Sequence, residues 1–349
     1  MELLAIDYRN PAFSIAMLLI VIATVALIDH LWGIVKQKRQ ARALNSFLSR
    51  FEGVHPATDY KDVLKMQPDS VGALLLLASI YFKSGEYSES MKIYIALLEI
   101  ISDKPIRITV MNHLARVYYK AGFLQRSRDI LLESLKLKAR NQEALRLLLI
   151  VYEQMREYKP AQEALAALNE LGDDVSLESA FLEANRVIHD AFLSVEKRCD
   201  MLKDLLAREP FLARVAINFL FAHNPKEAWK ALKEEWLADL VDCFWELEKG
   251  KFDPLEAIKY PLLEELYTAK GWLESAKQSS IFEFDLMIRL GAQRQIATIE
   301  FEYRCEHCLS LFPVHFYRCP NCLRLGCAKA EAVISKNTAA LDEDSANFY

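Results

Sequence analysis

Two pairs of cysteines near the C-terminus carry the clearest chemistry in this sequence. Cys305 and Cys308 form one CxxC pair, Cys319 and Cys322 form a second, and ten residues separate the two pairs. A two-residue gap lets both sulfurs of a pair converge on one ion while backbone amides point at them. Two such pairs complete a tetrahedral site of four thiolates, which we predict binds Zn²⁺, with Fe as the alternative ion. The competing interpretation is four unrelated buried or disulfide-paired cysteines.

Three further cysteines lie outside these pairs. Cys199 and Cys243 stand in apolar helical surroundings, which predicts buried thiols. Cys327 is close to the cluster in sequence and is either an alternative ligand or a bystander. Free thiols together with a four-thiolate site are typical of a reducing compartment.

The residues around the cysteine pairs predict a small ribbon. Residues 296–303 partly alternate β-branched or aromatic residues with polar ones, as a strand does, and lead directly into Cys305. Apolar residues between the pairs, from Leu311 to Tyr317, predict a short antiparallel return. About 25 residues cannot bury enough surface to fold alone, so metal binding would supply most of the folding free energy. We expect a metal-binding domain at 296–334, docked on the last repeats, and a disordered tail at 335–349.

The rest of the chain must position this ribbon, and its composition favours helices. The 349 residues include only 10 glycines and 11 prolines, and the net charge of −5 argues against a dedicated nucleic-acid binder. There is no glycine-rich phosphate loop, nucleophile elbow or HExxH motif. We therefore predict a protein that is not an enzyme.

A repeat fills the middle of the chain. Tyr81, Tyr118 and Tyr152 each follow an L-A or L-L dipeptide, and they are spaced 37 and then 34 residues apart. This spacing is close to the 34-residue period of the tetratricopeptide repeat, in which pairs of helices stack. Gly85 and Gly122 stand where the turn between the two helices needs a positive φ. The sequence thus predicts an all-α fold with a tetratricopeptide-repeat helical solenoid over residues 61–290.

Later repeats are less regular. Residues 215–232 repeat the spacing without the glycine, and residues 263–276 repeat it with the glycine restored at Gly271. Residues 171–210 and 233–260 are helical by apolar period but match poorly, and we interpret them as degenerate repeats. Stacked hairpins offer an extended concave surface suited to a peptide or a protein partner.

The N-terminus predicts a membrane anchor. Residues 12–28 contain no charged side chain, and 17 helical residues span about 26 Å, slightly less than the hydrocarbon core of about 30 Å. Trp32 is placed as an interfacial anchor, and several lysines and arginines follow from Lys36 onward. We expect a transmembrane anchor at 1–35, a basic helical stem at 36–60, a short N-terminus outside and the bulk of the chain in the cytoplasm. A buried helix of a soluble protein is the alternative.

Together these features resemble the lipopolysaccharide assembly protein B family. The resemblance rests on one span, a basic stem, cytoplasmic tetratricopeptide repeats and a terminal C-x2-C-x10-C-x2-C module, and it covers nearly the whole chain. The family's terminal module is described as rubredoxin-like, which implies Cys305, Cys308, Cys319 and Cys322 as metal ligands. The proline after Cys319 matches the family, whereas leucines 309 and 323 stand where a glycine is common.

The resemblance also implies a function. It implies a single-pass protein of the bacterial inner membrane, with a periplasmic N-terminus, that regulates lipopolysaccharide synthesis. Such an adaptor would promote degradation of the lipid A pathway deacetylase by the membrane AAA+ metalloprotease, and other lipopolysaccharide assembly proteins are further expected partners. One alternative is a generic inner-membrane scaffold that assembles envelope-biogenesis enzymes without a role in proteolysis. Another is electron transfer with iron in the four-cysteine site, although no flavin or nicotinamide fingerprint accompanies it.

Overall fold

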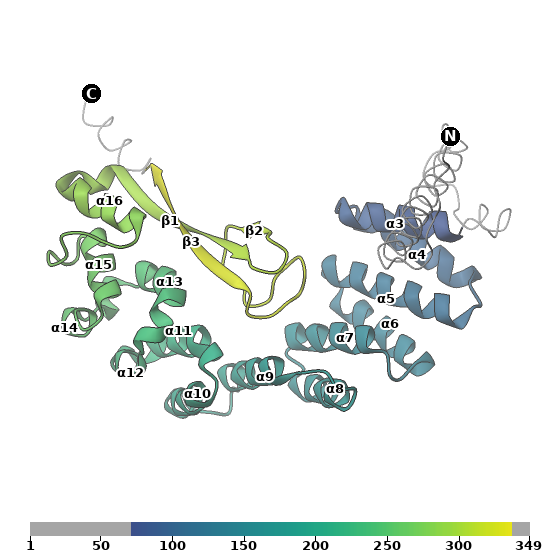
Figure 1. Cartoon of the computed structure of the whole chain (residues 1–349). Helices are drawn as coiled ribbons and strands as arrows, with labels where there is room; N and C mark the ends of the chain where they lie inside the picture. The colour runs from purple at the N-terminus through teal and green to yellow at the C-terminus, as the bar shows by residue number, and fades with distance from the viewer. Residues whose placement is uncertain (1–70, 337–349) are drawn as a thin grey trace, which may run out of the picture. The chain divides into compact units, whose positions relative to one another are not determined.

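The computed structural model describes residues 71–336 (Figure 1). The predicted anchor, the basic stem, residues 61–70 of the repeat region and residues 337–349 of the tail lie outside the described part. Within residues 71–336, no helix combines the length and the apolar character that a membrane span requires. The anchor therefore stays a prediction.

The chain divides into two compact units, with the division between Met155 and Arg156. The described part of the first unit consists of consecutive helices, each packed against the next. These helices are α3 (Val71–Lys83), α4 (Tyr87–Ile100), α5 (Lys104–Lys120), α6 (Leu124–Leu137) and α7 (Gln142–Met155).

The predicted repeat is visible in how paired helices of the first unit touch. The hydroxyl of Ser90 in α4 donates a 2.9 Å hydrogen bond to the carbonyl of Ala78 in α3. One repeat later, Ser127 in α6 donates a 2.8 Å hydrogen bond to the carbonyl of Ala115 in α5. All four side chains are fully buried, so these small residues let the two helices of each hairpin approach closely. The repeat spacing therefore corresponds to a repeated packing contact.

The turns inside these hairpins have the predicted form. Gly85 and Gly122 lie at φ of 81° and 82°. After Gly122, the amide of Phe123 donates to the carbonyl of Tyr118 at 2.8 Å, which is the hydrogen bond of a Schellman motif. In the third turn Arg156 occupies the corresponding position with φ of 59°, so an ordinary residue adopts the backbone conformation that glycine supplies elsewhere.

The second unit continues with shorter and less regular helices. Its α-helices are α8 (Tyr158–Glu170), α9 (Ser176–His189), α10 (Val195–Arg208), α11 (Ala213–His223), α12 (Pro225–Ala231), α13 (Val241–Glu246), α14 (Pro254–Ala257), α15 (Pro261–Lys270) and α16 (Phe282–Leu290). Its 3-10 helices are η2 (Pro210–Leu212), η3 (Glu234–Leu240), η4 (Lys249–Lys251) and η5 (Gly291–Ile296). The short elements from η3 to α14 account for the poor match of residues 233–260 to the repeat.

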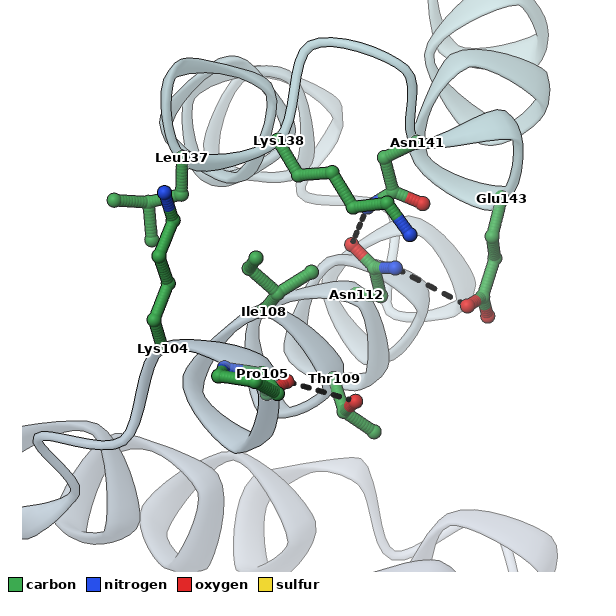
Figure 2. A pocket seen from close by; sticks show the side chains of 9 residues that line it. All are labelled: Lys104, Pro105, Ile108, Thr109, Asn112, Leu137, Lys138, Asn141 and Glu143. Carbon is green, nitrogen blue, oxygen red and sulfur yellow. Dashed lines mark hydrogen bonds between the residues drawn. The ribbon is translucent and has the colours of Figure 1, made fainter.

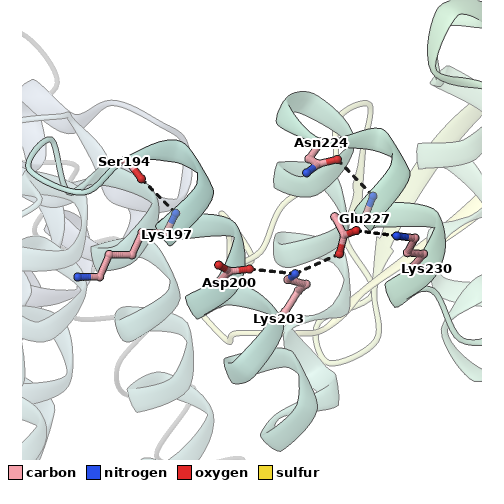
Figure 3. A network of polar contacts seen from close by, with 7 residues as sticks. All are labelled: Ser194, Lys197, Asp200, Lys203, Asn224, Glu227 and Lys230. Atoms are coloured by element: carbon pink, nitrogen blue, oxygen red, sulfur yellow. Dashed lines mark hydrogen bonds and ion pairs between the residues drawn. The ribbon is translucent and has the colours of Figure 1, made fainter.

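Polar side chains cap the N-termini of α10 and α12, and an ion pair joins these two helices (Figure 3). Ser194 and Asn224 each accept a 3.3 Å hydrogen bond from a backbone amide in the first turn of α10 and α12. Lys203 of α10 lies 3.0 Å from Asp200 and 3.2 Å from Glu227 of α12. Because such half-exposed ion pairs contribute at most about 1 kcal/mol, the buried apolar core is the main source of stability here.

One predicted hairpin is only half formed. Gly271 ends α15 in the left-handed conformation, as expected, but residues 272–281 form no second helix. Instead, the Glu265 carboxylate accepts hydrogen bonds from Ser279 and Ser280, and the amide of Ala276 donates to the hydroxyl of Thr268. These side-chain contacts hold an irregular segment, and the chain becomes helical again only in α16.

A three-stranded antiparallel sheet follows the helices, in the order β2-β1-β3. The predicted strand is β1 (Ala297–Cys305), and the predicted return is the two-residue β2 (Leu311–Phe312). The third strand, β3 (Ala328–Lys336), was not predicted, and it pairs with β1 along its whole length from Ala297↔Lys336 to Cys305↔Ala328. The sheet lies beside α13 and α16, as Figure 1 shows.

Candidate metal centre and repeat groove

The structure brings the four predicted cysteines together at the end of the sheet. Their sulfurs all lie within 4.8 Å of one another, with 3.7 Å between Cys305 and Cys322 and 3.6 Å between Cys308 and Cys319. A tetrahedral zinc site with bonds of about 2.3 Å needs sulfurs about 3.8 Å apart. The residues present therefore fit a metal ion held by four thiolates.

The two cysteine pairs sit in matching turns. The amide of Leu309 donates to the carbonyl of Cys305 at 2.8 Å, and the amide of Leu323 donates to that of Cys319 at 2.9 Å. Both leucines have positive φ, 59° and 63°, in the positions where the resembled family commonly has glycine. The turns thus form without glycine, although a left-handed backbone costs an L-residue about 1–2 kcal/mol.

Polar groups around the sulfurs favour thiolates on the more exposed side. Ser310 Oγ lies 3.4 Å from Cys308 Sγ, and its hydrogen bonds lower the pKa of that thiol to about 6. Asn321 Nδ2 donates to the same Ser310 hydroxyl at 3.0 Å, and this hydrogen bond holds the hydroxyl in its position beside Cys308 Sγ. Cys319 is fully buried, and burial raises its pKa to about 12. A bound cation would offset this cost, because a coordinating thiol is deprotonated by the ion's charge.

A fifth cysteine lies against this cluster. Cys327 Sγ is 3.4 Å from Cys305 Sγ, and its side chain is 6% exposed. It is outside the group whose sulfurs all lie within 4.8 Å of one another. The geometry therefore separates four prospective ligands from one neighbouring thiol.

The ribbon is docked on the helices of the second unit through a buried charge. Asp242, whose side chain is 1% exposed, forms an ion pair with Arg214 and accepts a 2.7 Å hydrogen bond from the Tyr303 hydroxyl of β1. The rings of Phe181 and Tyr317 pack with their centroids 5.5 Å apart. The ribbon therefore docks on helices, as expected, but its contacts reach back from α13 to α9 and are not confined to the last repeats.

The groove formed by α5, α6 and α7 in the first unit is a second candidate site (Figure 2). A cavity of about 490 Å³ lies there, with Lys104 and Lys138 among its lining residues. In its floor, the buried Asn112 donates to Glu143 at 3.1 Å, as Figure 2 shows. Asn112 also accepts a 2.9 Å hydrogen bond from Ser134. This groove was not predicted from the sequence, because its lining residues come from α5, from the end of α6 and from the turn into α7.

The charge of the groove is positive at its rim. Glu143 is neutralised by Arg116, whose guanidinium lies 3.2 Å away. Lys104 and Lys138 have no ion-pair partner within residues 71–336. The cavity therefore offers two ammonium groups, neither of them ion-paired in the described part of the chain, above a hydrogen-bonded amide network, which suits an anionic side chain or carboxylate.

Comparisons with known proteins agree with this fold. Residues 107–141 match the family model of the tetratricopeptide repeat. A stretch of 86 residues is 37% identical to the Protein CTR9 homolog of Arabidopsis thaliana; it covers 25% of this chain and 8% of that protein. The match shows a tetratricopeptide repeat at residues 107–141, which lie in α5, α6 and the turn before α7.

Solved structures of repeat proteins are also similar to this chain. A tetratricopeptide repeat protein from Parabacteroides merdae is 17% identical, with a TM-score of 0.42, over 76% of this chain and 97% of its own. YrrB, described as a TPR protein with an unusual peptide-binding site, is 14% identical, with a TM-score of 0.35, over 51% of this chain and 90% of its own.

Proposed function

We propose that this protein is a non-enzymatic adaptor whose tetratricopeptide repeats hold a segment of a partner protein. The observation that carries the proposal is the groove of α5, α6 and α7, where two lysines without an ion-pair partner among residues 71–336 flank a cavity lined largely by the matched residues 107–141. Extended concave surfaces of stacked hairpins are suited to holding peptides. The lysines favour an acidic segment, because a carboxylate gains a charge-assisted hydrogen bond from each ammonium group.

The ribbon with its four-cysteine site supports the same role, as a rigid end of the scaffold. Four cysteines that fit zinc, or iron as the alternative, hold the ribbon in shape, and the Asp242 contact fixes it on the helices. In this proposal Zn²⁺ is a structural ion, because all four of its positions are taken by protein sulfurs and none is open for a substrate.

The finer proposal comes from the family resemblance. The protein would be anchored in the bacterial inner membrane by residues 1–35 and would present a lipid A pathway deacetylase to the membrane AAA+ metalloprotease. Anchoring raises the local concentration of the adaptor near a membrane-bound protease, which strengthens a weak contact without new interactions. The alternative is an inner-membrane scaffold for envelope-biogenesis enzymes with no part in proteolysis.

The deciding experiment is a pulse-chase measurement of the deacetylase half-life in the native host, with and without this protein. The proposal predicts a longer half-life on depletion, restored by the wild-type gene. An unchanged half-life would refute the proteolytic role and favour the scaffold.

Groove variants then locate the binding surface. The double variant Lys104→Glu with Lys138→Glu reverses the charge at the rim and is expected to leave the half-life long. Lys136→Glu makes one Lys-to-Glu change, half the charge change of the double variant, on an exposed position of α6 outside the cavity, and it should restore the short half-life. Equal activity of the double variant and the control would exclude this groove as the binding surface.

A further inference from the structure

The position of Cys327 beside the cluster follows from the strand pairing. Cys327 directly precedes Ala328, which is the register partner of Cys305 at the end of the β1–β3 ladder. The amide of Glu306 donates to the carbonyl of Cys327 at 2.9 Å, which fixes the two backbones side by side. The 3.4 Å between the sulfurs of Cys305 and Cys327 is shorter than the 3.6 and 3.7 Å between pairs of prospective ligands.

Cys327 differs chemically from the other four cysteines. When four thiolates hold a metal ion, none of them carries a proton, and each sulfur shares its charge with the ion. The Cys327 sulfur lies outside this set, so it is not shared with the ion and is available to form a bond to a neighbouring sulfur. A thiol next to an oxidised cysteine is the usual route from a sulfenic acid to a disulfide.

We propose that Cys327 is a resolving thiol that converts peroxide oxidation of the metal site into a reversible Cys305–Cys327 disulfide. Cys305 is buried, but its sulfur lies 3.7 Å from that of the partly exposed Cys322, so in this proposal hydrogen peroxide reaches Cys305 from that side of the cluster. Formation of the disulfide removes one of the four ligands, so the ion is released. The metal site thereby becomes a site of redox modification.

The reaction is balanced with hydrogen peroxide as the oxidant. The Cys305 thiolate attacks one peroxide oxygen, the O–O bond breaks, and Cys305 sulfenic acid and hydroxide result. The Cys327 sulfur then attacks the sulfenic sulfur, the S–O bond breaks, and the oxygen leaves as water with the thiol proton. Each sulfur is oxidised by one electron, and the peroxide is reduced by two. The two sulfurs must approach from 3.4 Å to the bonding distance of about 2.05 Å.

The test uses the full-length protein loaded with one equivalent of zinc. After treatment with hydrogen peroxide, released zinc is measured with a chromogenic chelator, and tryptic peptides are mapped without reduction. Cleavage at Arg304, Arg318, Arg324 and Lys329 places Cys327 alone in peptide 325–329, Cys319 and Cys322 in 319–324, and Cys305 and Cys308 in 305–318. We expect peptide 325–329 linked to 305–318, with fragmentation assigning the bond to Cys305. A free 325–329 peptide, or a link to 319–324, would overturn the proposal.

Reversibility provides a second readout. Dithiothreitol with added zinc is expected to restore the full metal content of the oxidised wild type. The Cys327→Ala variant should bind one zinc before oxidation but recover at least threefold less afterwards, because its sulfenic acid proceeds to irreversible sulfinic acid. Cys199→Ala removes another buried thiol and should behave as the wild type. Equal recovery by Cys327→Ala and the wild type, or failure of Cys327→Ala to bind zinc before oxidation, would refute the assigned role.

Discussion

The buried carboxylate of Asp242 is expected to be a main determinant of ribbon docking. The Asp242→Leu substitution leaves the Arg214 guanidinium, whose side chain is 15% exposed, without its counter-ion. Removing one partner of a buried ion pair costs about 3–5 kcal/mol of unfolding free energy. Arg214 also donates to the Asp239 carbonyl at 3.0 Å, and that contact remains in the variant. We therefore expect the free energy of unfolding to fall by about 3 kcal/mol, the lower end of this range. Tyr303→Phe removes one hydrogen bond to a charged group, about 1.5–3 kcal/mol.

The effect of Asp242 should depend on pH in a defined direction. Burial alone raises the pKa of this carboxyl, but the hydrogen bond and charge of Arg214 outweigh burial and hold the pKa below its usual value of 3.8. A carboxyl with a lowered pKa in the folded state stabilises the fold above the unfolded pKa, and its contribution falls as the pH drops through the folded pKa. The difference between wild type and Asp242→Leu should therefore be constant near neutral pH and decrease below pH of about 4.

Urea unfolding of the zinc-loaded protein, followed by tryptophan fluorescence, measures this effect. Four of the five tryptophans lie in the second unit, so the signal reports on the helices that carry the ribbon. Asp239→Leu is the matched control, because that side chain is exposed and only its carbonyl contacts Arg214. If Asp242→Leu lowers the free energy of unfolding by less than about 1 kcal/mol, the ion pair contributes no more than an exposed surface pair, and the docking role given to Asp242 is refuted.

Three further predictions follow from contacts described above. Replacing Cys305 and Cys308 with serine should abolish stoichiometric zinc binding, measured by native mass spectrometry, and increase binding of a hydrophobic dye as the ribbon loosens; full zinc content would show that other residues hold the ion. Leu309→Gly relieves a left-handed backbone at a side chain that is 67% exposed, and should stabilise the zinc-loaded ribbon by about 1 kcal/mol in thermal unfolding. A destabilised Leu309→Gly variant would mean that this side chain contributes packing. Ser127→Ala removes a buried hydrogen bond between two helices, which should cost about 1 kcal/mol in urea unfolding, and an unchanged midpoint would contradict the packing role given to it.

The sequence predicted the local parts of this fold well. The tyrosine spacing identified the hairpins of the first unit, and Gly85 and Gly122 identified their turns, because a positive φ is a local requirement. The strand before Cys305 was recognised from its alternation of residue types. These features depend on residues close together in the chain.

Several features that depend on distant residues were not predicted. The strand β3 was missed because its sequence, rich in small alanines, gives little β-signal until it pairs with β1. The buried charge of Asp242 cannot be distinguished from a surface aspartate in sequence, since its partners lie on α11 and β1. The irregular segment after Gly271 depends on side-chain hydrogen bonds from α15, which no periodicity reveals.

The docking contacts also have a consequence for the order in which the chain folds. Repeat hairpins join residues that are near in sequence, and such local contacts form quickly. Tyr303 and Asp242 are 61 residues apart in the sequence, and Phe181 and Tyr317 are separated by most of the sequence of the second unit. Docking of the ribbon therefore costs more chain entropy, through closure of a long loop, than formation of a repeat hairpin does. We expect the helices to form first, as the chain emerges from the ribosome, and the ribbon to dock last. The supply of metal would then set the time at which a newly made molecule matures.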